Sequence, residues 1–165
     1  MLGTWYHVPI MLDIHTKAPR FTLLDEHEKE RSLDDYAGKW LVLYFYPKDD
    51  TPGCTEKACT IAEVYDDFEK MNVSVIGVSR DSSASHKKFK EKYNIPFTLL
   101  SDETTKMIQS YGAWSQKSMF GKKYMGIDRV TYIINPEGNI AKAYPKVSPA
   151  DHALLLLKDL KNLMQ

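Results

Sequence analysis

The chain has 165 residues, a length typical of one domain, and its content of 43% hydrophobic and 27% charged residues excludes a disordered chain. Lys plus Arg and Asp plus Glu number 22 each, so the formal net charge is zero and long-range attraction to nucleic acid or anionic lipid is not expected. No apolar run reaches the ~20 residues of a membrane span. The chain has two cysteines, Cys54 and Cys59, which exclude a disulfide scaffold and indicate redox chemistry or metal binding.

The first nine residues carry no Lys or Arg before their apolar part, and His7 and Pro9 interrupt that part. This pattern is unlike a secretory signal peptide, so we expect a cytoplasmic protein. The sequence has no Gly- or Ser-rich linker, internal repeat or low-complexity segment. We therefore expect one domain over residues 1–165.

The apolar pattern alternates along the chain between the strand period of 2 and the helix period of 3.6. Strands are expected at residues 21–24, 29–32, 41–46, 73–78, 97–100, 130–134 and 140–144. Helices are expected from Thr51-Pro52 to about Met71, from Ser82 or Ser83 to about Asn94, from Asp102 to Tyr111, and from Ser148 to Leu163. This order predicts an α/β fold with a mixed central β-sheet flanked by helices and an N-terminal β-hairpin.

Turn and cap residues support these boundaries. The strand at 41–46 is apolar on both faces, which is typical of the middle of a sheet covered by helices. Thr51 and Pro52 suit the N-cap and first position of a helix, and Gly112 suits the position after a helix end. Residues 135–138, Asn-Pro-Glu-Gly, predict a turn between the last two strands.

The strongest candidate site lies where the 41–46 strand passes into the helix that begins at Thr51-Pro52. Ligands of open α/β sheets bind beyond the carboxyl ends of the strands, and Cys54 falls there, at about the third helical position. Unpaired N–H groups and the positive end of the helix dipole favour a thiolate over a thiol at this position. Gly53 leaves the approach to the sulfur open, and the Thr51 hydroxyl can accept a helix N–H and still donate its proton.

The segment Pro47-x-x-x-Thr51-x-x-Cys54 resembles the active-site signature of peroxiredoxins. The longer run Phe45-Tyr-Pro-Lys-Asp-Asp-Thr-Pro-Gly-Cys-Thr55, with Cys59 five residues after Cys54, is similar to the bacterioferritin-comigratory, or peroxiredoxin Q, group. Further matches cover most of the chain after about residue 14, including Arg129 before the 130–134 strand. The resemblance implies a thioredoxin-like fold and a thiol-dependent peroxidase.

The resemblance also implies roles for individual residues. Cys54 matches the peroxidatic cysteine and Thr51 the threonine whose hydroxyl lies between the sulfur and the peroxide. Pro47 matches a proline that shapes the pocket, and Arg129 the arginine that stabilises the thiolate and orients the peroxide. Cys59 matches the resolving cysteine, which condenses with a Cys54 sulfenic acid to form an intramolecular disulfide, as in atypical 2-Cys enzymes.

The implied partners are a peroxide and a thioredoxin- or glutaredoxin-like reductant, with no cofactor, no metal, no nucleic acid and no membrane. The group includes monomers and dimers, so we expect a monomer or a weak homodimer. Helix geometry puts the Cα atoms of Cys54 and Cys59 ~8.6 Å apart, whereas a disulfide tolerates at most about 7 Å. A Cys54–Cys59 disulfide therefore requires the start of the helix to unwind.

Other interpretations of the same residues remain open. Cys59 could be a core cysteine, and Arg129 a surface residue at a strand edge. The protein could instead be a metal-binding thiol protein, or a general dithiol–disulfide oxidoreductase, although such exchange enzymes separate their cysteines by two residues rather than four. Asp49 and Asp50 are interpreted as a solvated loop at a helix start, and all five histidines as surface residues.

Overall fold

The computed structural model describes residues 11–165, so the first nine residues, which we expect not to be a signal peptide, lie outside the described part. The strands are β1 Thr22–Asp25, β2 Glu30–Ser32, β3 Trp40–Phe45, β4 Val73–Ser79, β5 Thr98–Ser101, β6 Trp114–Met119, β7 Lys122–Ile127, β8 Thr131–Ile134 and β9 Ile140–Tyr144. The α-helices are α1 Pro52–Glu63, α2 Tyr65–Lys70, α3 Ser83–Tyr93, α4 Lys106–Ser110 and α5 Pro149–Leu163, and a 3₁₀ helix, η1, spans Leu33–Tyr36.

Seven strands form a mixed sheet in the order β2-β1-β5-β4-β3-β8-β9. The neighbours β3, β4 and β5 run parallel, whereas β8 pairs antiparallel with β3, and β1 pairs antiparallel with β5. The expected mixed sheet and N-terminal hairpin are therefore confirmed. The central strand β3 is buried from Leu41 to Phe45, which explains why its sequence is apolar on both faces.

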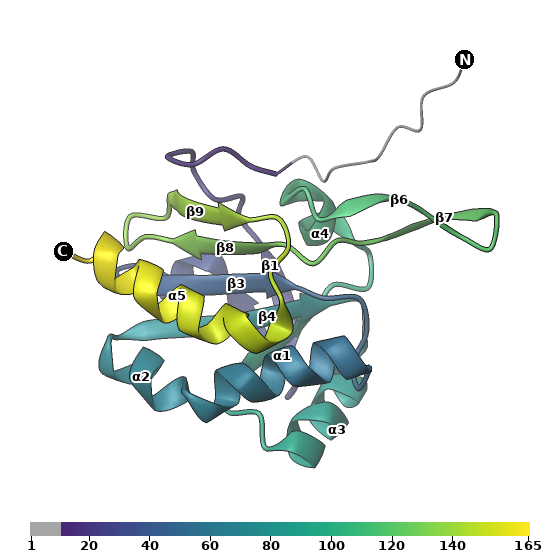
Figure 1. Ribbon diagram of the computed structural model, residues 1–165, viewed down its shortest axis with the longest axis horizontal. Coiled ribbons are helices and arrows are strands. Elements are labelled where there is room, and N and C mark those ends of the chain that lie inside the picture. Colours follow the sequence, from purple (N-terminus) through teal and green to yellow (C-terminus); the bar gives the residue numbers. More distant parts are fainter. Residues whose placement is uncertain (1–10) are drawn as a thin grey trace.

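Two apolar cores cover the two faces of this sheet. Because side chains alternate along a strand, Val42 and Tyr44 face the core formed with α1, α3 and α5, and Leu41 and Leu43 face the core formed with α4. Figure 1 shows α1 and α5 side by side in front of the sheet, and the two helices are in contact. This layer places the N-terminus of α1 at the carboxyl edge of the parallel strands.

The structure differs from expectation in two helices. The helix expected to run to Met71 ends at Glu63, because β-branched Val64 forms a tight turn with its N–H bonded to the Ile61 carbonyl, 3.2 Å away, before α2 begins. The helix expected from Asp102 begins at Lys106, after Thr105 adopts a φ of 64°. Gly112, with a φ of 68°, follows the end of α4 as expected.

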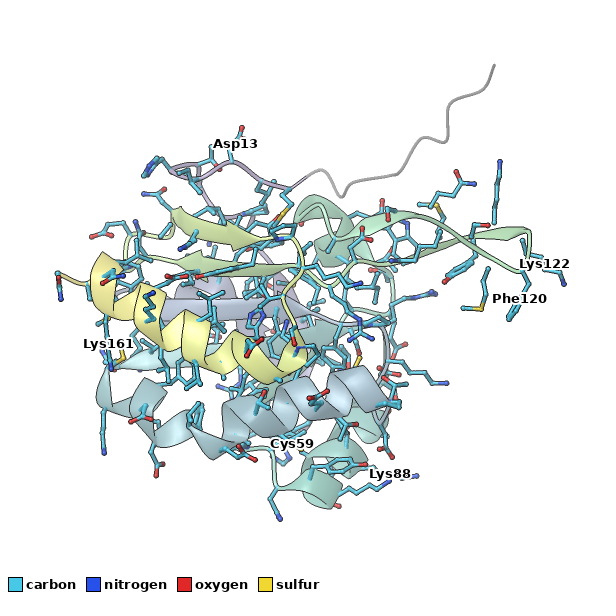
Figure 2. The ribbon with its side chains drawn as sticks, viewed as in Figure 1. Asp13, Cys59, Lys88, Phe120, Lys122 and Lys161 are labelled. Carbon is cyan, nitrogen blue, oxygen red and sulfur yellow. The ribbon has the colours of Figure 1, made fainter. Side chains whose placement is uncertain are left out.

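A third difference is the hairpin of β6 and β7, which extends away from the body of the molecule (Figure 1). Most of its residues are exposed, so neither strand needs an apolar face, and the sequence shows no clean apolar alternation that would predict the hairpin. Phe120 and Gly121 make the turn with positive φ values of 51° and 77°, and Phe120 is 96% exposed at the tip (Figure 2). Among residues 11–165, no helix combines the length and apolar character needed to cross a membrane.

Candidate active site

The loop between β3 and α1 carries three of the residues that the sequence singled out. Pro47 is exposed, Thr51 is half-buried at the N-cap of α1, and Cys54 is the third residue of the helix and only 1% exposed. The predicted position of Cys54 within the helix is confirmed. The first helical hydrogen bond joins the Thr55 N–H to the Thr51 carbonyl at 2.8 Å, so the N–H groups of Gly53 and Cys54 precede the helical ladder.

The Thr51 hydroxyl is oriented differently from the sequence expectation. It accepts no helix N–H and instead donates to the Lys48 carbonyl oxygen at 2.9 Å. Its donor is therefore occupied within the loop, and its lone pairs are free to accept. The bond joins the N-cap of α1 to the loop that precedes it.

Arg129 reaches the start of α1 from the segment between β7 and β8. A Cβ atom placed on Gly53 would lie 3.0 Å from Nη1 and 3.3 Å from Nη2 of the Arg129 guanidinium. The guanidinium therefore packs directly against the residue that precedes Cys54. A glycine at this position permits the contact, and the contact brings a permanent positive charge to the helix N-terminus.

A cavity of about 360 Å³ opens beside Arg129. Its wall combines Pro47, the β6–β7 hairpin and the loop before α5, and it is lined by Pro47, Lys117, Tyr124, Gly126, Ile127, Asp128, Arg129, Pro145 and Lys146. Lys117 is held by an ion pair with Asp128 at 3.1 Å. The sequence patterns missed the contribution of this hairpin because its exposed strands gave no clear signal.

Cys59 is half-buried on α1 (Figure 2). Both cysteines are free thiols. Burial raises the pKa of the Cys59 thiol, and the neighbouring Glu63 carboxylate raises it further. Cys59 is therefore a poor nucleophile while the helix is intact. Cys59 thus has a carboxylate neighbour, whereas the Arg129 guanidinium packs against the residue before Cys54.

Lys57 is a buried cation of this site that the sequence analysis did not single out. It lies one helical turn after Cys54 and is 4% exposed, and its ammonium donates to the Thr131 hydroxyl at 3.1 Å. The ammonium also lies 4.6 Å from the centroid of the Tyr44 ring. Burial, and then the charge of Arg129, lower the pKa of Lys57 to about 7. A lysine three residues after Cys54, on the face shared with Ala58 and Ile61, was the available signal.

Asp49 is buried, so its interpretation as part of a solvated loop was wrong. Its carboxylate accepts from the Tyr46 hydroxyl at 2.6 Å and lies 2.7 Å from Nδ1 of His86, and its N–H donates to Asp81 at 2.9 Å. These bonds tie the loop before α1 to α3 and to the end of β4. Asp50, by contrast, is exposed and paired with Lys92, as expected of a helix-start loop.

The expectation that every histidine lies on the surface was also wrong. His15 and His27 are exposed, whereas His86 is 0% and His152 1% exposed, and His7 lies outside the described residues. His86 forms hydrogen bonds to the Asp49 carboxylate and to the Leu100 carbonyl, which lies 3.0 Å from Nε2. His152 faces the Tyr144 ring across the α5 interface, with a centroid separation of 5.8 Å. Such burial depends on contacts between distant segments.

Within residues 11–165, the acidic and imidazole groups with metal-ligand spacing are Asp49, Asp81 and His86. This cluster includes neither cysteine, and its members are bonded to one another and to the loop. We interpret it as a hydrogen-bonded cluster that holds the loop before α1 in place.

Residues 14–143 match the AhpC/TSA family. The chain is 44% identical over 154 residues to peroxiredoxin Bcp of Bacillus subtilis, with 93% of this chain and 98% of that protein covered. It is 38% identical over 144 residues to peroxiredoxin Bcp of Escherichia coli, with 87% and 92% covered.

Solved structures agree with this result. The bacterioferritin comigratory protein of Xanthomonas campestris, a peroxiredoxin Q, superposes with a TM-score of 0.86 at 35% identity, covering 93% of this chain and 100% of that chain. The expected thioredoxin-like fold is thereby confirmed. The chain belongs to the AhpC/TSA family, within its Bcp or peroxiredoxin Q group of thiol peroxidases.

Proposed function

We propose that this chain, as one domain over residues 1–165, reduces hydrogen peroxide and organic hydroperoxides by a two-cysteine mechanism with Cys54 as the nucleophile. The observation that carries the proposal is the start of α1, where the Arg129 guanidinium packs against Gly53 beside Cys54. The apolar part of the cavity beside Arg129 supports organic hydroperoxides as substrates in addition to hydrogen peroxide. The Xanthomonas campestris relative is described with alkyl peroxide reduction activity.

In the first step the Cys54 thiolate attacks the terminal peroxide oxygen. The S–O bond forms as the O–O bond breaks, so the sulfur is oxidised to a sulfenic acid and the peroxide leaves as hydroxide or alkoxide, which takes a proton to give water or an alcohol. Arg129 and the N–H groups that begin α1 stabilise the negative charge on the departing oxygen. Thr51 orients the peroxide, and Pro47 shields the pocket.

In the second step Cys59 attacks the sulfenic sulfur. An S–S bond forms between Cys54 and Cys59 as water leaves, and no external oxidant is needed. The raised pKa of Cys59 in the intact helix returns toward its ordinary value when the helix unwinds and exposes the thiol. Unwinding therefore brings Cys59 within reach and makes it a better nucleophile.

In the third step an external dithiol reduces the Cys54–Cys59 disulfide by thiol exchange and is itself oxidised. We propose a thioredoxin- or glutaredoxin-like protein as this reductant, with no cofactor bound to the peroxidase. The working species is a monomer or a weak homodimer, because all the residues invoked come from one chain.

A peroxidase assay coupled to thioredoxin, thioredoxin reductase and NADPH tests the proposal on the wild type and on the Cys54→Ser and Cys59→Ser variants. Cys54→Ser should lose essentially all activity, because a serine hydroxyl is scarcely ionised at neutral pH. Retention of a tenth of the activity, about 1.4 kcal/mol of barrier, would rule out Cys54 as the sole nucleophile. Stoichiometric metal in the purified protein, or disulfide exchange without peroxide consumption, would favour a metal-binding or an oxidoreductase function.

A further inference from the structure

The tip of the β6–β7 hairpin exposes a cluster of apolar side chains to solvent. Residues 118–125 are all exposed, and four of them are large and apolar, namely Met119, Phe120, Tyr124 and Met125. The other exposed large apolar residues of the described chain are spread over the N-terminal segment, β1 and α5. Soluble proteins rarely gather such residues on one surface unless that surface binds a partner.

The turn at this tip is not optimised for its own stability. Met119 pairs with Lys122, so Phe120 and Gly121 form a two-residue loop, and both have positive φ values, 51° and 77°. This is the type I′ turn, for which asparagine followed by glycine is the favoured pair. A bulky aromatic residue is strained in the left-handed region, and the Phe120 ring is 96% exposed (Figure 2). Neither the turn nor the core therefore explains the ring, so we look for its partner outside the chain.

Lysines without counter-charges flank the apolar tip. Lys122 and Lys123 are exposed, and within residues 11–165 neither forms an ion pair, whereas Lys117 pairs with Asp128. The sequence has no Asp or Glu from residue 104 to residue 127. A six-residue strand spans about 20 Å, which exceeds the Debye length of ~8 Å at physiological ionic strength. Acidic residues on the body of the molecule therefore do not neutralise the tip, which is locally positive although the whole chain has no net charge.

An apolar tip with flanking lysines fits an anionic lipid surface better than it fits a protein surface. A stable protein interface takes about 20–30 residues from each side, whereas the tip offers a few side chains at the end of an extended hairpin (Figure 1). The interface of a bilayer accepts a small apolar insertion together with lysines that face the headgroups. Pairing with the same hairpin of a second copy would instead bring like charges together.

We propose that the tip of the β6–β7 hairpin, residues 118–125, docks this chain reversibly on anionic lipid bilayers. Met119 and Phe120 enter the interface between headgroups and acyl chains, while Lys122 and Lys123 face the lipid phosphates. The chain lies on the bilayer and does not cross it. The expectation of no attraction to anionic lipid took the charge of the whole chain, which averages over this local feature. The docking goes beyond the proposed peroxidase function and does not depend on it.

The same hairpin links the docking tip to the candidate active site. Lys117 and Tyr124 line the cavity beside Arg129. Docking through the tip would hold this cavity near the bilayer surface, where hydroperoxides of unsaturated acyl chains arise. A lipid surface would then serve as a source of organic hydroperoxides for the proposed function.

Flotation of the full chain with vesicles of equal parts phosphatidylglycerol and phosphatidylcholine tests the docking. Half of the protein should bind at a lipid concentration on the order of 1 mM, because a few apolar side chains and two lysines give weak, reversible attachment. Vesicles of phosphatidylcholine alone should bind at least about tenfold more weakly. Salt at about 1 M should release the protein, because the Debye length then falls to about 3 Å.

Phe120→Asn separates the contribution of the ring from that of the turn. The substitution supplies the favoured residue type for this turn, so the hairpin should stay folded, while binding should weaken at least about tenfold through the lost apolar area. Leu154→Gln, which removes an exposed apolar side chain from α5, is the matched control and should bind as the wild type.

The lysines are tested as a pair. Lys122→Gln combined with Lys123→Gln should weaken binding to the anionic vesicles about 25-fold, at about fivefold for each lysine. Lys87→Gln combined with Lys88→Gln, at two adjacent exposed positions of α3, should leave binding unchanged.

Three results would overturn the inference. One is no binding of the wild type at about tenfold more lipid than expected, which would leave an acidic protein as the occupant of the tip. Another is unchanged vesicle binding by Phe120→Asn. The third is a wild-type dimer in sedimentation velocity that Phe120→Asn abolishes, which would assign the tip to a second copy. None of these measurements uses peroxide, so they stand apart from the test of the proposed function.

Discussion

At the scale of single residues, the contact between Arg129 and Gly53 decides how much positive charge reaches Cys54. Both terminal guanidinium nitrogens lie close to the position that a Gly53 side chain would occupy, so the edge of the planar group that carries them faces the helix start. A planar, permanently charged fork differs from a flexible ammonium in geometry as well as in charge. The contact can therefore be tested by substitution of Arg129 and, separately, by substitution of Gly53.

Replacing Arg129 with Lys keeps one positive charge but removes the fork. We expect the rate of peroxide reduction by Cys54 to fall about 10²-fold, the size of one lost preorganised donor. Stopped-flow measurement of the reduced enzyme checks this, with thermal unfolding as a control for folding. An Arg129→Lys variant with wild-type kinetics would show that the planar group is not required.

Gly53→Ala tests the same contact from the helix side. Because the new Cβ would lie 3.0 Å from Nη1, the guanidinium must move by a few tenths of an ångström, and we expect the peroxide rate to fall about tenfold. The free energy of unfolding should stay equal or rise by less than about 1 kcal/mol, since alanine favours a helix. In an Arg129→Ala background the Gly53→Ala effect should vanish, and its persistence there would mean that the methyl group blocks the peroxide itself.

At the scale of elements, the mechanism we propose requires two conformations of α1. In that mechanism its first turns present Cys54 to the peroxide, and the same turns open before Cys59 reaches Cys54. The helix ends at Glu63 and not at Met71, so the segment proposed to open is one short helix, while α2 is separately anchored by Phe68 in the core. Opening at a helix terminus costs less than opening in the middle of a core element.

We expect peroxide-treated wild type to contain an intramolecular Cys54–Cys59 disulfide by mass spectrometry, with faster amide exchange over residues 52–62 than in the reduced form. The reason is geometric, because ~8.6 Å between the Cα atoms of the intact helix exceeds what a disulfide allows. Cys59→Ser should consume one equivalent of peroxide and then stall with thioredoxin. Full turnover of Cys59→Ser would make Cys59 a core residue and the enzyme a one-cysteine type.

At the scale of the whole molecule, α5 closes the core over α1 and buries His152 against Tyr144. Neither ring nitrogen of His152 has a hydrogen-bond partner among the described residues, and burial, followed by the charge of Lys57, lowers the pKa of His152 to about 3. The folded state therefore holds this imidazole neutral where the unfolded chain, with a pKa of ~6.5, binds a proton. This difference destabilises the fold in acid.

As pH falls from ~6.5 toward about 3, the unfolded state gains a proton that the folded state excludes, so stability is lost across that window. His152→Phe should remove this contribution. Relative to neutral pH, the wild type should lose roughly 2–3 kcal/mol more than the variant at about pH 4.5, measured by urea unfolding. His27→Gln, at an exposed histidine, is the control, and an equal acid response of wild type and His152→Phe would show that His152 is protonated in the fold.

The sequence by itself determined the seven strands of the central sheet, the mixed character of that sheet and the position of Cys54 at a helix start, because these depend on apolar period, on Thr-Pro and Gly caps, and on a short motif. It also singled out Arg129, through resemblance to peroxiredoxins. These are local signals, readable over about ten residues, and the structure agrees with them in β3, α3 and α5.

Only the tertiary structure decided the surroundings of Cys54. Asp49, His86 and His152 look like surface residues in sequence, and each is buried by a segment far away along the chain. Lys57 is one of 18 lysines in the sequence, and only the packing of β3, β8 and α5 buries its side chain, one helical turn after Cys54. Burial and the neighbouring charges are properties of packing, and packing between segments distant in sequence leaves no local pattern.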